Sequence, residues 1–273
     1  MSAGKTGLDS FDTVGLAELV ATAALLTRVD RKYVIRRSDL THVLSALQDQ
    51  VPGVRVLQED GARAFAYESM YFDTPDLASY LAAARKRRRR FKVRTRAYLD
   101  SGACYLEVKT RGGRSTTVKD RLGYDIAARD TLTEEGWRYA AGILDEAGID
   151  EVGDQRLDPI LATRYGRSTM LLPSGSRATV DLDLEWELDG GETLRLPDLA
   201  IVESKSGSAP SELDRLLWRS GTRPVGISKY GVGLAALRPD LPANKWSRVL
   251  RRHFPAPSSA QPRLSAATGV HAA

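Results

Sequence analysis

Residues 88–99 read RRRFKVRTRAYL, a stretch in which basic side chains alternate with other side chains at a period of two. Because successive side chains of a β-strand point to opposite faces of the sheet, this stretch predicts a strand with one cationic face. That face carries Arg88, Arg90, Lys92, Arg94 and Arg96. For one strand alone the ordinary interpretation is a polar face exposed to solvent, with the other face on a hydrophobic core. The neighbouring segments decide between this interpretation and a cationic face that binds a ligand.

Three further segments alternate in the same way, and their polar faces mix cations with carboxylates. These faces carry Tyr105, Glu107, Lys109 and Arg111, then Arg177, Thr179, Asp181, Asp183, Glu185 and Glu187, and finally Glu203 and Lys205. Turn-forming residues separate the segments, which is typical of antiparallel strands in series. Several charged strand faces, with apolar faces that amphipathic helices can cover, predict an α+β fold: an antiparallel β tunnel barrel with a charged lumen, flanked by helices.

The rest of the pattern adds helices and further strands around this series. We expect helices at residues 11–26, 38–46, 77–84, 133–147 and 210–218. We expect strands at residues 26–35, 65–72, 88–99, 104–110, 115–122, 160–172, 177–188 and 199–205, with a loop at Gly112-Gly113.

Length and composition indicate one folded unit. The chain has 273 residues, of which 42% are hydrophobic, so it can bury a sizeable core. We expect an N-terminal tail at 1–10, a single domain at 11–254 and a disordered C-terminal tail at 255–273. The N-terminus has no signal-peptide pattern, and the longest apolar segment, at 16–26, is too short to span a bilayer. We therefore expect a cytoplasmic protein without a transmembrane segment.

The residue types also limit the kinds of metal site. One cysteine and three histidines exclude a disulfide framework and a zinc site built of Cys and His. Any metal ion would therefore be held by carboxylates.

The positive charge of the chain is concentrated in one region. Residues 85–121 contain 14 basic and three acidic residues, so this region carries +11 while the rest of the chain sums to −6. Like charges about 4 Å apart repel by about 4 kcal/mol at an effective dielectric constant of about 20, so a cationic lumen implies a bound polyanion. Composition alone leaves nucleic acid, anionic lipid and polyphosphate open. The carboxylates of Glu107, Asp181, Asp183 and Glu203 would neutralise part of the charge and suit Mg²⁺ or Mn²⁺.

Eight short motifs follow one another in a characteristic order. They are Asp30-Arg31-Lys32-Tyr33, Tyr71-Phe72-Asp73-Thr74, Arg94-Thr95-Arg96-Ala97-Tyr98, Leu106-Glu107-Val108-Lys109-Thr110, Tyr165-Gly166-Arg167, Val180-Asp181-Leu182-Asp183, Val202-Glu203-Ser204-Lys205 and Ser228-Lys229-Tyr230. This series resembles the VTC domain, the polyphosphate polymerase domain of the vacuolar transporter chaperone complex, within the CYTH-like superfamily of triphosphate tunnel metalloenzymes. The resemblance covers residues 27–231.

The resemblance implies a tunnel that binds the triphosphate of ATP and transfers the γ-phosphate to a growing polyphosphate chain, which makes the chain a metal-dependent phosphotransferase. The cations implied to act on the transferred phosphates are Arg94, Arg96, Lys109, Arg167 and Arg177. Further phosphate-binding residues would be Lys32, Lys92, Lys205 and Lys229. The metal ligand it implies is Glu203, to which the strand pattern adds Glu107, Asp181 and Asp183 as candidates. ATP and inorganic polyphosphate are the expected partners, together with a membrane protein partner and without nucleic acid.

One departure from the superfamily bears on the reaction. The superfamily's opening signature has two glutamates before a lysine, whereas this chain has Arg28, Asp30 and Lys32 at those places. Fewer carboxylates leave less means of activating water, which favours polymerase over hydrolase. The alternatives are a triphosphatase of the same fold and a non-catalytic module that binds polyphosphate or inositol phosphate. Nucleic-acid binding by residues 86–90 is a further alternative, although no paired aromatic platform accompanies that run.

Overall fold

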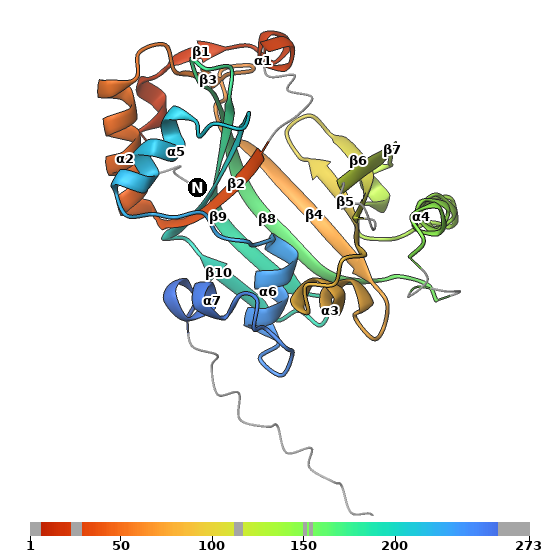
Figure 1. Cartoon of the computed structure of the whole chain (residues 1–273). Coiled ribbons are helices and arrows are strands. Elements are labelled where there is room, and N and C mark those ends of the chain that lie inside the picture. The colour runs from red at the N-terminus through yellow and green to blue at the C-terminus, as the bar shows by residue number, and fades with distance from the viewer. Residues whose placement is uncertain (1–6, 23–28, 112–116, 150–151, 153–154, 256–273) are drawn as a thin grey trace, which may run out of the picture.

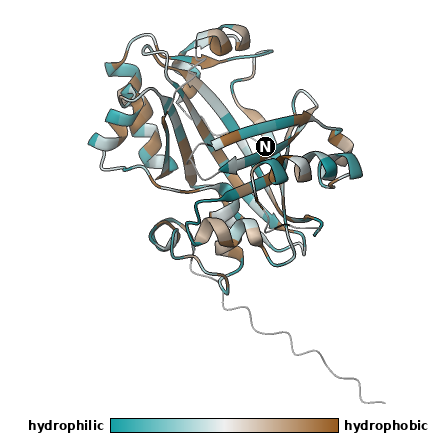
Figure 2. Ribbon diagram, turned by 45° about the vertical axis from the view of Figure 1, so that its right-hand side comes forward, coloured by the Kyte–Doolittle hydropathy of each residue, from teal (hydrophilic) through white to brown (hydrophobic). Residues whose placement is uncertain are grey.

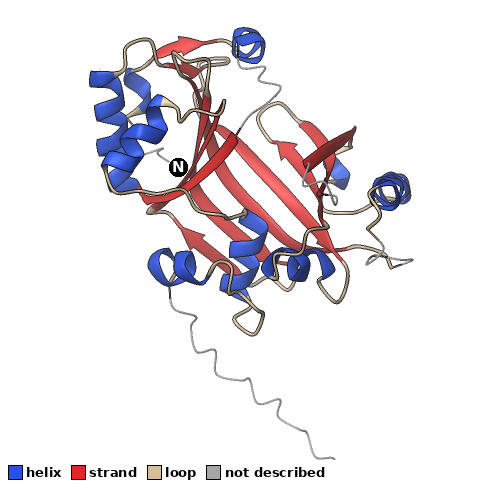
Figure 3. Cartoon of the chain, viewed as in Figure 1, coloured by secondary structure: helices blue, strands red, loops and turns tan. Residues whose placement is uncertain are grey.

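A large antiparallel sheet forms the centre of the molecule (Figures 1 and 3). The structure is a computed structural model, and it describes residues 7–22, 29–111, 117–149, 152 and 155–255. The main path of the sheet runs β2-β11-β9-β8-β4-β5-β6-β7. Its strands are β2 (Val29–Arg36), β4 (Phe65–Asp73), β5 (Arg90–Tyr98), β6 (Ala103–Arg111), β7 (Thr117–Gly123), β8 (Asp158–Leu171), β9 (Arg177–Leu188) and β11 (Leu199–Ser206). Three short strands join it at the margins: β1 (Asp12–Val14), β3 (Arg55–Leu57) and β10 (Thr193–Leu196).

Helices cover the sheet in separate groups. They are α1 (Leu16–Thr22), α2 (Arg37–Gln50), α3 (Ala78–Ala84), α4 (Glu134–Glu146), α5 (Glu212–Arg219), α6 (Lys229–Leu237) and α7 (Ser247–His253), with single 3₁₀ turns at η1 (Leu8–Ser10) and η2 (Ile126–Ala128). One hydrophobic cluster joins α2 and α5 to β2, β9 and β11, and another joins α4 to β5 and β6. None of the helices in the described residues is long and apolar enough to cross a membrane.

Each of the eight expected strands overlaps a strand of the structure, because strict alternation is a strong signal. The prediction of one helix at residues 11–26 is wrong: β1 comes first and pairs with β3, and of the described residues 11–22 only α1 is helical, while residues 23–26 lie outside the described part of the chain. The short strands β1, β3 and β10 and the helices α6 and α7 were not predicted. Residues 1–6 and 256–273 of the expected tails, and the loop at Gly112-Gly113, lie outside the described residues. Leu8, within the expected N-terminal tail, is buried in the core.

The expected mixture of helices with an antiparallel sheet is present, but the expected closed barrel is not confirmed. Within the described residues, no strand pairing joins β7 to β2, so the sheet is open there. The backbone N–H of Val225, in the loop before α6, donates to the carbonyl of Lys32, so a loop bonds to β2 in place of a closing strand. The sheet nevertheless curls, so that strands far apart in the strand order approach each other. The charges of Lys32 on β2 and Glu203 on β11 act on Lys109 on β6.

The two faces of the curled sheet differ in chemistry. Along β5, buried and half-buried residues alternate without a break, and Figure 2 shows hydrophilic and hydrophobic residues alternating along the strands. Phe91 and Val93 pack against Leu106 and, from α4, Ala140 on the outer face. We call the other face, which carries Arg94, Glu107, Arg167, Asp181 and Glu203, the inner face; strand register aligns these positions between neighbouring strands.

Helix α6 fills one end of the curled sheet. It packs in a hydrophobic cluster with Tyr71, Leu161 and Trp186 from β4, β8 and β9, and Figure 1 shows it lying against the sheet near β8 and β10. Gly233 allows this close approach, since a methyl group there would collide with the indole ring of Trp186. The same indole donates from Nε1 to the carbonyl oxygen of Lys229 at 3.0 Å, which fixes the first residue of α6.

Replacing Gly233 with alanine should destabilise the protein by about 1–3 kcal/mol, because the added methyl group overpacks the contact with Trp186. Urea unfolding followed by tryptophan fluorescence would measure the loss. The matched control is Gly142→Ala in α4, where an added methyl group meets no neighbour. It should be neutral or stabilise by up to about 1 kcal/mol, since alanine favours a helix interior over glycine. Equal effects of the two substitutions would contradict the tight seating of α6.

Candidate functional site

The inner face gathers cations from seven strands and one helix. The residues implicated by the sequence lie on it as follows: Lys32 on β2, Lys92, Arg94 and Arg96 on β5, Glu107 and Lys109 on β6, Arg167 on β8, Arg177 and Asp181 on β9, Glu203 and Lys205 on β11, and Lys229 at the start of α6. Three carboxylates on this face organise the cations, and each holds two of them.

Glu107 holds the first pair of cations. Arg94 donates from Nε and Nη2 to Glu107 Oε2 at 2.9 and 2.6 Å, and Lys119 on β7 donates to Oε1 at 2.6 Å. Arg94 also donates from Nη1 to the hydroxyl of Tyr71 at 2.9 Å. Burial alone would raise the pKa of Glu107, but Arg94, Arg96 and Lys119 outweigh it and hold that pKa well below its usual range. The carboxylate therefore stays ionised and fixes the arginine fork.

Asp181 holds the second pair and is the most deeply buried of the three. Arg167 binds it with two parallel hydrogen bonds, Nε to Oδ1 at 2.6 Å and Nη2 to Oδ2 at 2.8 Å, and Lys229 also pairs with Oδ2. Burial opposes ionisation, yet Arg167 and Lys229 lower the pKa of Asp181 to about 2. Stacked Tyr67 and Tyr165 rings form the floor, with the Arg167 guanidinium about 5 Å from each ring centre.

Glu203 holds the third pair. Its Oε1 lies 2.8 Å from Lys32 Nζ and 3.7 Å from Lys205 Nζ. Burial would raise the pKa of Glu203, but Lys32 and Lys205 hold it well below its usual range. Arg177 lies directly opposite Lys205 in the strand register, so it belongs to the same part of the inner face.

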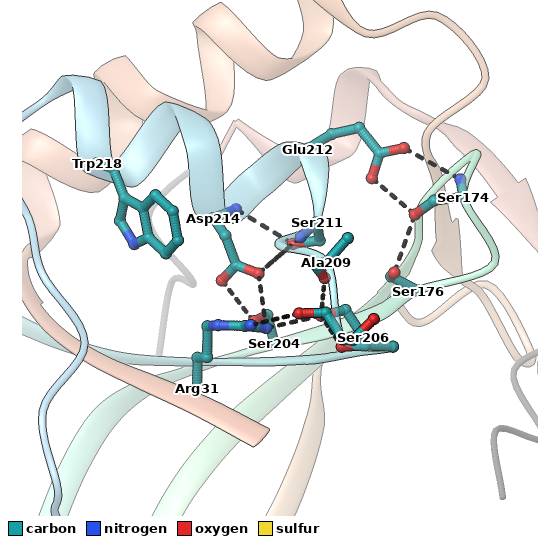
Figure 4. A network of polar contacts seen from close by, with 12 residues as sticks. Arg31, Ser174, Ser176, Ser204, Ser206, Ala209, Ser211, Glu212, Asp214 and Trp218 are labelled. Carbon is teal, nitrogen blue, oxygen red and sulfur yellow. Dashed lines mark hydrogen bonds and ion pairs between the residues drawn. The ribbon is translucent and has the colours of Figure 1, made fainter. Parts of the chain in front are cut away.

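A buried polar network behind β2 and β11 fixes the strands that carry this third pair (Figure 4). Asp214 of α5 is fully buried and accepts a hydrogen bond from the hydroxyl of Ser204 at 2.5 Å. The hydroxyl of Tyr33 donates to the same carboxylate at 2.6 Å. Arg31 lies 3.6 Å from the same carboxylate. These three residues alternate along the strands with Lys32, Glu203 and Lys205, so bonds on the outer face set the positions of charges on the inner face.

Arg96 differs from the other arginines of this region. Its guanidinium lies 5.8 Å from the ring centre of Tyr67, and its Nε is buried without a hydrogen-bond partner in the described part of the chain. A buried donor without an acceptor costs about 1–3 kcal/mol, so it marks a place where an anion would restore the missing bond.

Asp183 is the predicted site residue that the structure does not bring to the inner face. The β8–β9 register shifts between Arg164 and Gly166, and Asp183 adopts a left-handed backbone with φ of 51°. Its side chain is 62% exposed and pairs with Arg37 at 3.1 Å. Beyond this irregularity the faces exchange, so Glu185 and Glu187 bind Arg164 instead of continuing the line of Asp181.

The carboxylates of the inner face fit a metal ion only in part. Among the described residues, no group of three or more Asp, Glu, His or Cys side chains could form a metal cage. Glu107 and Asp181 each use both oxygens for cations, whereas both ion pairs of Glu203 run through Oε1. Mg²⁺ commonly takes one or two protein carboxylates and completes its coordination with phosphate oxygens and water. The donor set therefore fits an ion that Glu203 would hold together with phosphate oxygens of a ligand. It does not fit a preformed cage of four carboxylates.

Sequence reasoning did not select Lys119 or the tyrosines of the inner face. Lys119 was missed because its strand, β7, carries a weak alternation. Tyr67 and Tyr71 are four residues apart on β4 and therefore share a face, and that spacing was an available signal.

A surface hollow of about 350 Å³ lies elsewhere, between α2 and α5. Its lining includes His42, Val43 and Leu216. Both helices pack on the outer face of the sheet, so this hollow is separate from the inner face.

Lys92 is the most perturbed lysine of the inner face. Burial, and then the neighbouring cations Lys109, Lys245, Arg94 and Arg90, lower the pKa of its amine to about 7. Lys92 therefore loses its charge near neutral pH while no anion is bound.

Comparison with known proteins gives one family and a number of similar solved structures. The family model of the VTC domain matches residues 27–238. A search of curated proteins gave no match. HpAC1 from Hippeastrum, described as a proposed adenylyl cyclase with a dominant triphosphatase activity, is 19% identical with a TM-score of 0.46, over 76% of this chain and 94% of that chain. The PH1819 protein of Pyrococcus horikoshii OT3 is 13% identical with a TM-score of 0.40, over 75% and 97%.

Binding of a phosphate anion beside Lys92 should be coupled to proton uptake. An anion favours the ammonium form and raises its pKa, so at pH 8 the bound state holds a proton that the free state lacks. The affinity for tripolyphosphate should accordingly fall as the pH rises from about 6 to about 9. Calorimetry at pH 8 in two buffers of different ionisation enthalpy measures the uptake. The number of protons taken up by the wild-type protein should exceed the number taken up by a Lys92→Met variant by about half to one. Equal uptake in both proteins would disprove that Lys92 is the group that gains the proton.

Proposed function

The chain belongs to the VTC domain family, and on this premise we propose that it is a metal-dependent polyphosphate polymerase that transfers the γ-phosphate of ATP to the end of a polyphosphate chain. The observation that carries the proposal is the composition of the inner face. Cations from separate elements converge there on two buried carboxylates and one half-buried carboxylate, and Arg96 has a buried donor without an acceptor. Such a face suits a ligand with several negative charges in a row.

The proposed reaction needs little covalent chemistry from the protein. The bond between the γ-phosphorus and its bridging oxygen breaks, a terminal oxygen of the polyphosphate chain bonds to that phosphorus, and ADP leaves. The attacking oxygen is already anionic, so no general base is required. What the side chains supply is alignment of the two reactants and stabilisation of charge on the transferred phosphoryl group.

Prior fixation of the arginines makes them effective in this role. Arg94 and Arg167 are held by Glu107 and Asp181 before any ligand arrives, so their remaining donors need no reorganisation on binding. Arg96 is held by strand geometry instead, and its guanidinium is available for the phosphoryl oxygens. Lys109, Arg177, Lys32, Lys205 and Lys229 add positive charge around this centre.

A divalent cation would be held by Glu203 together with phosphate oxygens of the ligand. Such an ion neutralises charge on the phosphates and orients them. Lys32 and Lys205 keep the Glu203 carboxylate ionised, which is the form that binds a metal. Magnesium and manganese both accept this type of oxygen donor.

Incubation of the purified protein with ATP and Mn²⁺ should produce polyphosphate that a gel resolves by length. Arg96→Ala should lower the rate by about 100-fold or more, because it removes charge stabilisation at the transferred phosphoryl group. Its stability should change little, since within the described residues Arg96 makes no ion pair and its removal also removes a buried donor that has no acceptor. The matched control is Arg138→Ala on the exposed surface of α4, which should keep full activity.

The products of this assay also separate the alternatives. Free phosphate without longer chains would identify a triphosphatase, and tight polyphosphate binding without turnover would identify a binding module. Full activity of Arg96→Ala would contradict the assignment of the inner face as the reaction centre.

A further inference from the structure

Asp73, the last residue of β4, is a fully buried carboxylate that lies outside the three ion-paired centres. In the described part of the chain it pairs with no lysine or arginine, and four hydrogen bonds satisfy it instead. It accepts from the backbone N–H groups of Thr74 and Ser79 at Oδ1, and from the backbone N–H of Tyr80 and the hydroxyl of Tyr230 at Oδ2. Asp73 thus joins the end of β4 to the first turn of α3 and to α6, two helices that contact each other at one end of the sheet (Figure 1).

The side chain of Tyr230 is held by this carboxylate and by two neighbouring rings. Its hydroxyl donates to Asp73 at 2.6 Å. Burial raises the pKa of Asp73, and the bond from Tyr230 is the largest of the effects that oppose the rise. The ring of Tyr230 stacks on Tyr71 with the ring centres 5.1 Å apart, and it lies perpendicular to the ring of Tyr80 at 6.2 Å. One hydrogen bond and two ring contacts therefore fix Tyr230 inside the protein.

Tyr230 is connected to two of the three ion-paired centres. Along the chain it follows Lys229, whose ammonium pairs with Asp181, so the position of Tyr230 sets the turn of α6 from which Lys229 extends. Across the stacked rings it contacts Tyr71, whose hydroxyl accepts a hydrogen bond from Arg94 Nη1 at 2.9 Å. A shift of Tyr230 would therefore move two cations of the inner face together.

Ordinary core packing does not require the bond between Tyr230 and Asp73. Tyr71, Tyr80 and Tyr230 belong to one hydrophobic cluster, and the ring of Tyr230 alone would fill the same space. A carboxylate and a hydroxyl are costly to bury in such a cluster, and they are satisfied only in an arrangement that brings them together. The bond therefore specifies the position of α6 more narrowly than apolar contact does.

We propose that Asp73 and Tyr230 are positioning residues for the phosphoryl transfer. The hydrogen bond between them holds Lys229 and Arg94 in the alignment that the reaction needs. This inference rests on the proposed function, because it concerns the cations of the same reaction centre. Both side chains are closed off from solvent, so they act only through the residues that they hold. Their effect falls on the rate more than on binding, because many cations share the charge that binds the ligand, whereas a misplacement of about 1 Å can slow a reaction about 100-fold.

Tyr230→Phe tests the inference, because it removes the hydroxyl and keeps the ring. Release of ADP from ATP would be measured with Mn²⁺ for the variant and for the wild-type protein. The kcat should fall by about tenfold or more, while the KM for ATP changes by less than about threefold. The matched control is Tyr80→Phe, which removes a hydroxyl from another fully buried ring of the same cluster, one that donates to the carbonyl of Pro242 at 3.2 Å. Its kcat should change by less than about twofold.

A second comparison separates positioning from a purely structural role. In a Lys229→Met background, Tyr230→Phe should lower kcat by no more than about threefold, because the cation that Tyr230 positions is absent. Tyr71→Phe removes the bond to Arg94 and keeps both stacked rings, so it should lower kcat by about threefold through the second route. Thermal unfolding verifies that each variant is folded at the assay temperature, and Tyr71→Phe carries the test if Tyr230→Phe is not.

The outcomes distinguish failure of this inference from failure of the proposed function. A kcat of Tyr230→Phe within about twofold of the Tyr80→Phe value would overturn the positioning role, as would an undiminished loss in the Lys229→Met background. Release of ADP without polyphosphate would refute the proposed polymerase but leave the comparison of kcat values decisive, since transfer of the γ-phosphate to water also releases ADP. No release of ADP by the wild-type protein would overturn both.

Discussion

Mutual repulsion among lysine and arginine side chains is the constraint that the rest of this structure has to satisfy. Three carboxylates, two buried and one half-buried, meet it at the centre of the inner face, and each binds two cations from different elements. Glu107 joins β5 to β7, Asp181 joins β8 to α6, and Glu203 joins β2 to its own strand. Removing one carboxylate would leave two cations close together in a partly buried place, which is costly.

The opposite face and the ends of the sheet keep these charges in position. Hydrophobic clusters beneath α2, α4 and α5 hold the strands from outside, so the inner side chains need not pack against each other. Helix α6 packs closely on Trp186 and thereby delivers Lys229 to Asp181. The hydrogen bonds of Asp214 align β2 with β11 behind Lys32 and Glu203. The stabilisation gained from apolar packing thus offsets the repulsion between the converging cations.

Sequence alone predicts the parts of the site that lie on uninterrupted strands. The alternation in residues 88–99 assigns Lys92, Arg94 and Arg96 to one face because a single period of two runs through the strand. The same rule fails at Asp183, where a left-handed backbone exchanges the inner and outer faces of β9. No pattern of residues predicts that exchange. The seating of α6 depends on contact between Gly233 and Trp186, which are far apart in the chain, so it could not be derived from periodicity. The loop contact of Val225 with the edge strand β2 also joins segments that are far apart in the chain, so periodicity could not predict it either.

If the cations of the inner face converge on linked phosphates, a crystal structure of the protein with tripolyphosphate will show the ligand there. The phosphates should lie on the inner face, with oxygens within hydrogen-bond distance of Arg96 and beside Arg94 and Arg167. Phosphates bound only at the exposed residues 85–89 or in the hollow between α2 and α5, with the inner face unchanged, would contradict this convergence.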